Sequence, residues 1–138
     1  MQLSSVQKFN QALIQMAVLF YQVDRKVTLT EQDALDDVMS KIEWNSPISI
    51  DAFKTEAIFL ARQSIDVGEG INFLKAMAPD LLYDADRAME VACFITGVDG
   101  ERSEEEVEYL HLLTHKLLAK ALSPNKKECL ETEPKTAA

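Results

Sequence analysis

Apolar residues recur along most of this chain at the three- and four-residue spacing of one face of an α-helix. In the first such segment, about residues 3–23, Phe9, Leu13 and Phe20 follow this spacing, and Ile14 and Val18 form a second apolar face. A helix on the surface of a globular protein normally has a single apolar face. The first helix is therefore expected at the centre of the molecule, with neighbours on both sides.

Similar patterns predict five more helices. They span about residues 28–43, 51–65, 71–78, 80–98 and 103–122. Asp51 is expected to cap the third helix, while Gly68 and Gly70 mark a break and Pro79 suits the start of the following helix. The chain has only four glycines and four prolines, which limits the number of short strands.

The connections after the first and fifth predicted helices repeat each other. Residues 23–32 read VDRKVTLTEQ and residues 98–107 read VDGERSEEEV, seventy-five positions later. Three polar positions coincide: Asp24 with Asp99, Thr28 with Ser103, and Glu31 with Glu106. Within each copy, Thr28 with Glu31 and Ser103 with Glu106 have the spacing of a capping box. We therefore expect an all-α bundle of about six helices from two pseudo-symmetric helix-loop-helix halves, in one domain (1–122) with a mobile C-terminal tail (123–138).

The formal net charge of −9 disfavours nucleic acid as a partner, because nucleic-acid binding draws its affinity from basic groups. The longest nearly apolar run, residues 12–21, is far shorter than the roughly 20 residues that a membrane span requires. Cys93 lies in an apolar helical pattern and Cys129 in a polar tail, so both are expected as free thiols. With no signal peptide evident, a cytoplasmic location is expected.

The acidic connections suggest a cation site. Asp99, Gly100 and Glu106 have the spacing of the fifth, sixth and twelfth positions of a calcium-binding EF-hand loop. The same register places Ile95 and Gly97 at the first and third positions, where that loop needs oxygen ligands. The repeat is therefore not expected to be an EF-hand.

A looser divalent-cation site remains open. Asp24, Glu31, Asp99 and Glu106 all carry the hard oxygen ligands that Ca²⁺, Mn²⁺ or Mg²⁺ prefer. The competing interpretation gives Ser103 and Glu106 only a capping role and leaves the other acidic residues to favour the positive end of the helix dipole.

A weaker metal candidate lies on the last predicted helix. His111 and His115 are one turn apart, and Glu108 precedes His111 by the three-residue spacing found in ferritin-like di-iron bundles. The alternative is a solvated stripe of polar side chains. The chain contains neither a nucleophile elbow nor a glycine-rich phosphate loop after a strand, so we expect a non-enzymatic protein.

The segment from Val91 to Leu118, VACFITGVDGERSEEEVEYLHLLTHKLL, resembles the TerB-like family. This is the tellurite-resistance helical domain, also found in the N-terminal region of a membrane-anchored DnaJ-type co-chaperone, and the resemblance covers about residues 3–122. It implies an all-helical bundle of two related halves and a role in bacterial stress response, in the cytoplasm or at the inner membrane face. It also implies cation binding at Asp24, Glu31, Asp99 and Glu106. The first copy departs from the pattern, since Arg25 replaces the usual glycine.

Together these features predict a non-enzymatic stress-response or envelope-associated module that acts through contacts with a protein partner and through cation binding at the acidic connections. A homo-oligomer is compatible with this prediction. One alternative is a pure protein-interaction adaptor whose connections are only structural. A less favoured alternative is a metalloprotein that uses Glu108, His111 and His115.

Overall fold

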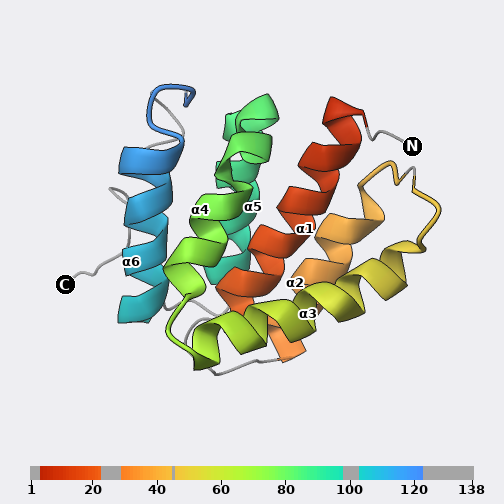
Figure 1. Ribbon diagram of the computed structural model, residues 1–138, viewed down its shortest axis with the longest axis horizontal. Coiled ribbons are helices and arrows are strands. Elements are labelled where there is room, and N and C mark those ends of the chain that lie inside the picture. The colour runs from red at the N-terminus through yellow and green to blue at the C-terminus, as the bar shows by residue number, and fades with distance from the viewer. Residues whose placement is uncertain (1–3, 23–28, 45, 98–102, 123–138) are drawn as a thin grey trace.

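The computed structural model describes residues 4–22, 29–44, 46–97 and 103–122, and these residues form helices and no strand (Figure 1). The α-helices are α1 (Ser5–Gln22), α2 (Leu29–Ser40), α3 (Ile50–Asp66), α4 (Gly70–Leu81), α5 (Ala85–Gly97) and α6 (Glu104–Leu112). A 3-10 turn, η1 (Leu82–Asp84), joins α4 to α5, and a π-helical turn, η2 (Leu113–Leu117), continues α6. The predicted all-α class is confirmed for the described residues. The predicted tail (123–138) lies outside them.

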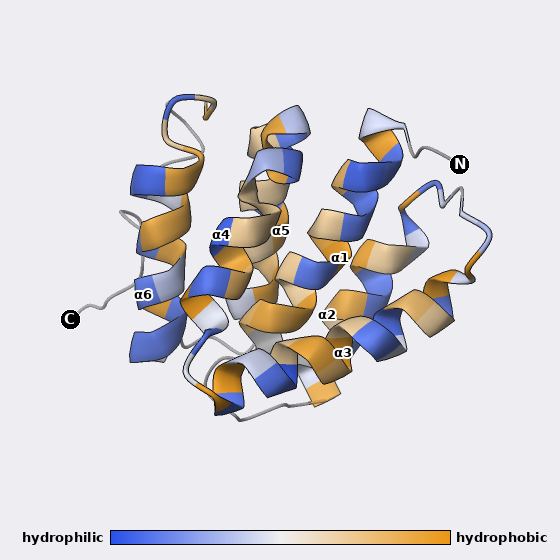
Figure 2. Cartoon of the chain, viewed as in Figure 1, coloured by the Kyte–Doolittle hydropathy of each residue, from blue (hydrophilic) through white to orange (hydrophobic). Residues whose placement is uncertain are grey.

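Helix α1 lies in the middle of the bundle and packs against α2, α3, α4 and α5 (Figure 1). Ile14, Val18 and Leu19 have no exposed surface, although they lie on different sides of the helix from Leu13, which is only 1% exposed. The prediction of a central helix is therefore confirmed. Figure 2 shows that α1 and α3 are both mainly hydrophobic where α3 crosses α1.

Two buried polar residues of α1 tie it to its neighbours. The Nδ2 atom of Asn10 donates to the backbone oxygen of Glu43, at 3.0 Å. The Nε2 atom of Gln22 donates to the backbone oxygen of Ile58, at 3.3 Å, and its Oε1 accepts from Nε of Arg62, at 3.1 Å. Since a buried amide without a partner would destabilise the fold, these bonds favour the observed placement of α3 and of the connection before it.

Two helix boundaries differ from the sequence prediction. Ser49, not Asp51, caps α3, because its hydroxyl accepts from the backbone N–H of Ala52 at 3.1 Å. Helix α4 does not stop at Ala78 but continues through Pro79 to Leu81. Leu81 is completely buried, as is Leu74 two turns earlier, so continued burial of this face offsets the hydrogen bond that the proline cannot make.

The last helix also differs from its prediction. The regular α-helix ends at Leu112, and the backbone N–H of Leu118 then bonds to the oxygen of Leu113, five residues back, at 2.9 Å. A π-turn of this kind rotates the following side chains around the helix axis. Leu118 and Leu122, which follow the turn, are buried, as is Leu113 at its start, whereas Ala121 is exposed.

Gly68 and Gly70 serve different purposes in the break between α3 and α4. Gly68 has a φ of 78°, in the left-handed region where a side chain would strain the backbone. Gly70 is buried against the ring of Tyr109 on α6, and a Cβ atom there would clash with the Tyr109 hydroxyl. Tyr109 also packs edge-on against Phe20 of α1, with 6.2 Å between ring centroids. Gly70 therefore allows α6 to approach α4 and α1.

None of the described helices is both long enough and apolar enough to cross a lipid bilayer.

We expect Gly70→Ala to lower the free energy of unfolding by about 1–3 kcal/mol, because the new methyl group would overlap the Tyr109 hydroxyl. In a Tyr109→Phe background the loss should shrink, since the nearest remaining ring atom lies 3.2 Å from the place that the new Cβ would occupy. Gly68→Ala is the matched control, because its cost comes from backbone strain and should be equal in both backgrounds. The free energy of unfolding of each protein is measured by urea unfolding, with circular dichroism as the signal. An unchanged Gly70→Ala loss in the Tyr109→Phe background would contradict this account.

Candidate functional site

The start of α6 has the capping box that the sequence predicts. The hydroxyl of Ser103 accepts from the backbone N–H of Glu106, at 3.1 Å, and the Oε1 atom of Glu106 accepts from the backbone N–H of Ser103, at 2.9 Å. These bonds satisfy two backbone donors that a helix start otherwise leaves open. Glu106 is only 2% exposed, whereas Glu104 and Glu105 are exposed in the same turn.

The four predicted cation ligands are described to different extents. Asp24 and Asp99 lie outside the described residues, and Glu31 lies in α2 without a described side chain. Only the Glu106 carboxylate is placed, and one of its oxygens already takes part in the capping box. The structure therefore supports the structural role of Glu106, and the four-residue cation site stays a prediction.

The histidines form a pair on the outer side of the last helix. The rings of His111 and His115 are stacked, with 5.0 Å between centroids and 27° between planes, and both side chains are exposed. Glu108 lies about one turn before His111. Within the described part of the chain, no three histidine, cysteine or acidic side chains come together closely enough to hold a metal ion. The predicted metal site of Glu108, His111 and His115 is not assembled in this conformation.

These polar residues line one side of a groove between α4 and the last helix, which we call the α4–α6 groove. It has a volume of about 390 Å³. Its lining comprises Ile71 and Lys75 of α4, Glu108, His111 and Leu112 of α6, and His115 and Lys116 of η2. The sequence pattern identified the histidine stripe but not its partners on α4, because periodicity does not reveal which helices are neighbours.

A second groove, the α2–α5 groove, has a volume of about 230 Å³. It is lined by Asp37, Val38 and Lys41 at the end of α2 and by Arg87, Glu90, Val91 and Phe94 of α5. Val38 and Val91 are buried, whereas Phe94 is 44% exposed. The sequence reasoning did not identify this groove, although two ion-pair spacings, Asp37 with Lys41 and Arg87 with Glu90, were available as a signal.

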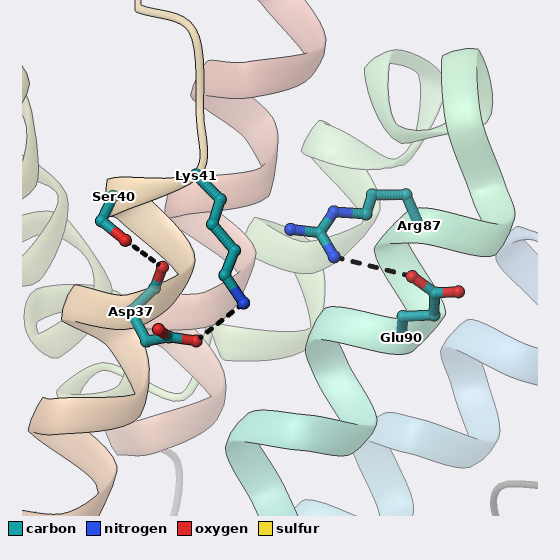
Figure 3. A network of polar contacts seen from close by, with 5 residues as sticks. All are labelled: Asp37, Ser40, Lys41, Arg87 and Glu90. Carbon is teal, nitrogen blue, oxygen red and sulfur yellow. Dashed lines mark hydrogen bonds and ion pairs between the residues drawn. The ribbon is translucent and has the colours of Figure 1, made fainter.

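Each charged residue of the α2–α5 groove pairs with a partner three or four residues away in the sequence, as Figure 3 shows. Lys41 Nζ lies 3.2 Å from an oxygen of Asp37, and a guanidinium nitrogen of Arg87 lies 3.5 Å from an oxygen of Glu90. Both long basic side chains extend into the space between the helices (Figure 3). Such exposed pairs contribute little to stability, but they give this groove a rim with both signs of charge.

Burial and a neighbouring charge clearly perturb the ionisation of Tyr109. Burial of its ring, together with the negative charge of Glu108, raises the pKa of the Tyr109 phenol above the ordinary value of 10.0. The hydroxyl is therefore neutral at physiological pH and acts as a packing group against Gly70, not as an acid or base.

The structure corrects the sequence interpretation of Cys93. This residue is half-buried on α5, and it is disulfide-bonded instead of being a free thiol. The other cysteine of the chain, Cys129, lies outside the described residues. The partial exposure of Cys93 explains why its position in an apolar pattern did not exclude a disulfide.

We expect Ser103→Ala to lower the free energy of unfolding by about 1 kcal/mol, because the cap of α6 loses its acceptor. Ser103→Asp should restore most of this loss, since a carboxylate also caps a helix start. Ser49→Ala at the start of α3 provides the matched control for removing a simple serine cap. Urea unfolding measures the free energy of unfolding of the parent and the three variants. A Ser103→Ala protein as stable as the parent would show that the capping box does not hold α6.

Comparison of the chain with protein-family models, with curated proteins and with solved structures finds no match. The resemblance to the TerB-like family therefore rests on the repeated connections and the segment from Val91 to Leu118.

Proposed function

We propose that this chain is a non-enzymatic TerB-like module that binds another protein in a stress-response or envelope-associated system. The observation that carries this proposal is the α2–α5 groove, in which the exposed ring of Phe94 lies beside the charged rim described above. We assign the module to the cytoplasm or the inner membrane face by its family resemblance alone.

The α2–α5 groove has the composition of a protein interface. Interfaces typically have an apolar centre, often with an aromatic anchor, and a polar rim that remains near water. Phe94 provides the anchor, while Lys41 and Arg87 extend from opposite sides of the groove (Figure 3). Since each basic group already has an acidic partner three or four residues away in the sequence, the rim is charge-balanced. This balance favours a protein segment with charges of both signs over a polyanion such as nucleic acid.

The helix boundaries support an internal duplication. Helix α1 ends at Gln22 and α5 at Gly97, while α2 begins at Leu29 and α6 at Glu104. Both pairs are separated by the same seventy-five positions as the repeated sequence. We propose that the two helix-loop-helix units are pseudo-symmetric halves of one domain, as the TerB-like resemblance implies.

A divalent-cation site at the acidic connections is the second candidate function. It is favoured by the burial of the Glu106 carboxylate at the end of a connection that also contains Asp99. A buried carboxylate is stabilised by a nearby cation, and Ca²⁺, Mn²⁺ and Mg²⁺ all prefer such oxygen ligands. In this proposal Asp24 and Glu31 hold the corresponding place in the first copy, where Arg25 and Lys26 add positive charge.

The adaptor proposal predicts that Phe94→Asp abolishes capture of a specific protein partner from the native host. A buried carboxylate at the centre of an interface would cost more than the lost ring contacts alone. Phe59→Asp is the matched control, because Phe59 is a 64% exposed phenylalanine on α3, outside the α2–α5 groove. Affinity capture with quantitative mass spectrometry compares the parent with both variants, after circular dichroism has shown that each is folded. Equal loss of the partner in both variants, or loss in neither, would contradict the proposal.

The cation proposal predicts that Ca²⁺, Mn²⁺ or Mg²⁺, at concentrations on the order of millimolar, changes the NMR signals of residues 98–106 before others. Glu106→Gln combined with Asp99→Asn should remove the response and still leave α6 capped, since glutamine also serves in a capping box. Glu105→Gln, an exposed neighbour, controls for the loss of negative charge. Absence of any metal response in the parent would leave the connections with a structural role only.

A further inference from the structure

The α4–α6 groove differs from the α2–α5 groove in its balance of charge. Its rim carries two lysines, Lys75 and Lys116, and two imidazoles, against the single carboxylate of Glu108. The chain as a whole has a net charge of −9. A local excess of basic groups on an acidic protein concentrates anions at that place and repels them from the surrounding surface.

The two groove lysines are also available to a ligand. Lys41, Lys54 and Arg87 are each held by a carboxylate within 4 Å. Among the residues that the structure describes, no ion pair engages Lys75 or Lys116. Both side chains are exposed, so they can reach an anion without first breaking an existing salt bridge.

The floor of the groove is apolar. Ile71 and Leu112 are half-buried and pack against the hydrophobic core, one from α4 and the other from α6. The stacked rings of His111 and His115 add a flat aromatic surface with N–H donors at its edge. The lining therefore offers contacts both to a hydrocarbon body and to an anionic head.

The size of the groove favours a small ligand. A volume of about 390 Å³ lies in the range of about 300–1,000 Å³ that is usual for small-molecule sites. Glu108, His111 and His115 line the groove, but no three metal-binding side chains among the described residues come close enough together to hold a metal ion, so a metal ion alone does not fit this arrangement. A purely apolar ligand would leave the lysines unused.

We infer that the α4–α6 groove binds a small amphipathic organic anion, such as a medium-chain carboxylate. The carboxylate bonds to Lys75 and Lys116, and the hydrocarbon chain lies on Ile71 and Leu112. This site is separate from the α2–α5 groove and from the acidic connections, so it does not depend on the proposed function.

NMR titration of the full chain with octanoate tests this inference. We expect octanoate to shift the signals of the groove residues first and to bind more tightly than 1-octanol, which lacks the charge, or inorganic phosphate, which lacks the apolar body. Lys75→Ala combined with Lys116→Ala should weaken octanoate binding at least about tenfold, because the charged hydrogen bonds are lost.

Lys41→Ala combined with Arg87→Ala is the matched control, since it also removes two positive charges but from the α2–α5 groove. Octanoate binding should be nearly unchanged in this variant. Equal weakening in both double variants would show a general charge effect and overturn the inference. Equal affinity for octanoate and phosphate, or for octanoate and octanol, would do so too. A glutamate-rich peptide that displaces octanoate and binds more tightly would assign the groove to a protein partner instead.

Discussion

Burial of α1 on all sides is the constraint on which the rest of the structure depends. A fully buried valine, leucine, isoleucine, phenylalanine or methionine side chain stabilises the fold by about 1.5–3 kcal/mol. Helix α1 carries such residues along most of its length. That contribution requires neighbours around the whole helix, which α2, α3, α4 and α5 provide. The buried amides of Asn10 and Gln22 add selectivity, because they are satisfied only by particular backbone and side-chain partners.

Helix α6 depends on this centre more indirectly. It reaches the core through Tyr109, whose ring meets Phe20 of α1 and lies against Gly70 of α4. The η2 turn that continues it adds Thr114, whose hydroxyl lies 3.6 Å from the sulfur of Met89 on α5. The side of α6 that carries the histidines is left open toward α4. The α4–α6 groove is thus a consequence of how α6 is attached, and the capping box at Ser103 fixes where that helix begins.

Sequence patterns gave correct predictions where the feature depends only on residues close together in the chain. The capping box at Ser103 and the helix stop at Gly68 follow from interactions over a few residues, and both are present. The prediction was wrong where a distant contact outweighed the local signal. Pro79 lies within α4 because Leu81 gains burial in the core, and the regular pattern beyond Leu112 gives way to a π-turn that buries Leu118.

The sequence by itself determined the helical class, the central position of the first helix and the capping role of Glu106, because these depend on residue spacing along one segment. Only the tertiary structure decided that Lys75 lies beside the histidine stripe and that Lys41 and Arg87 share a groove. It also decided that Gly70 is needed for the approach of Tyr109. Each of these relations joins residues of different helices, and the packing that brings them together is set by the whole core and not by any one segment.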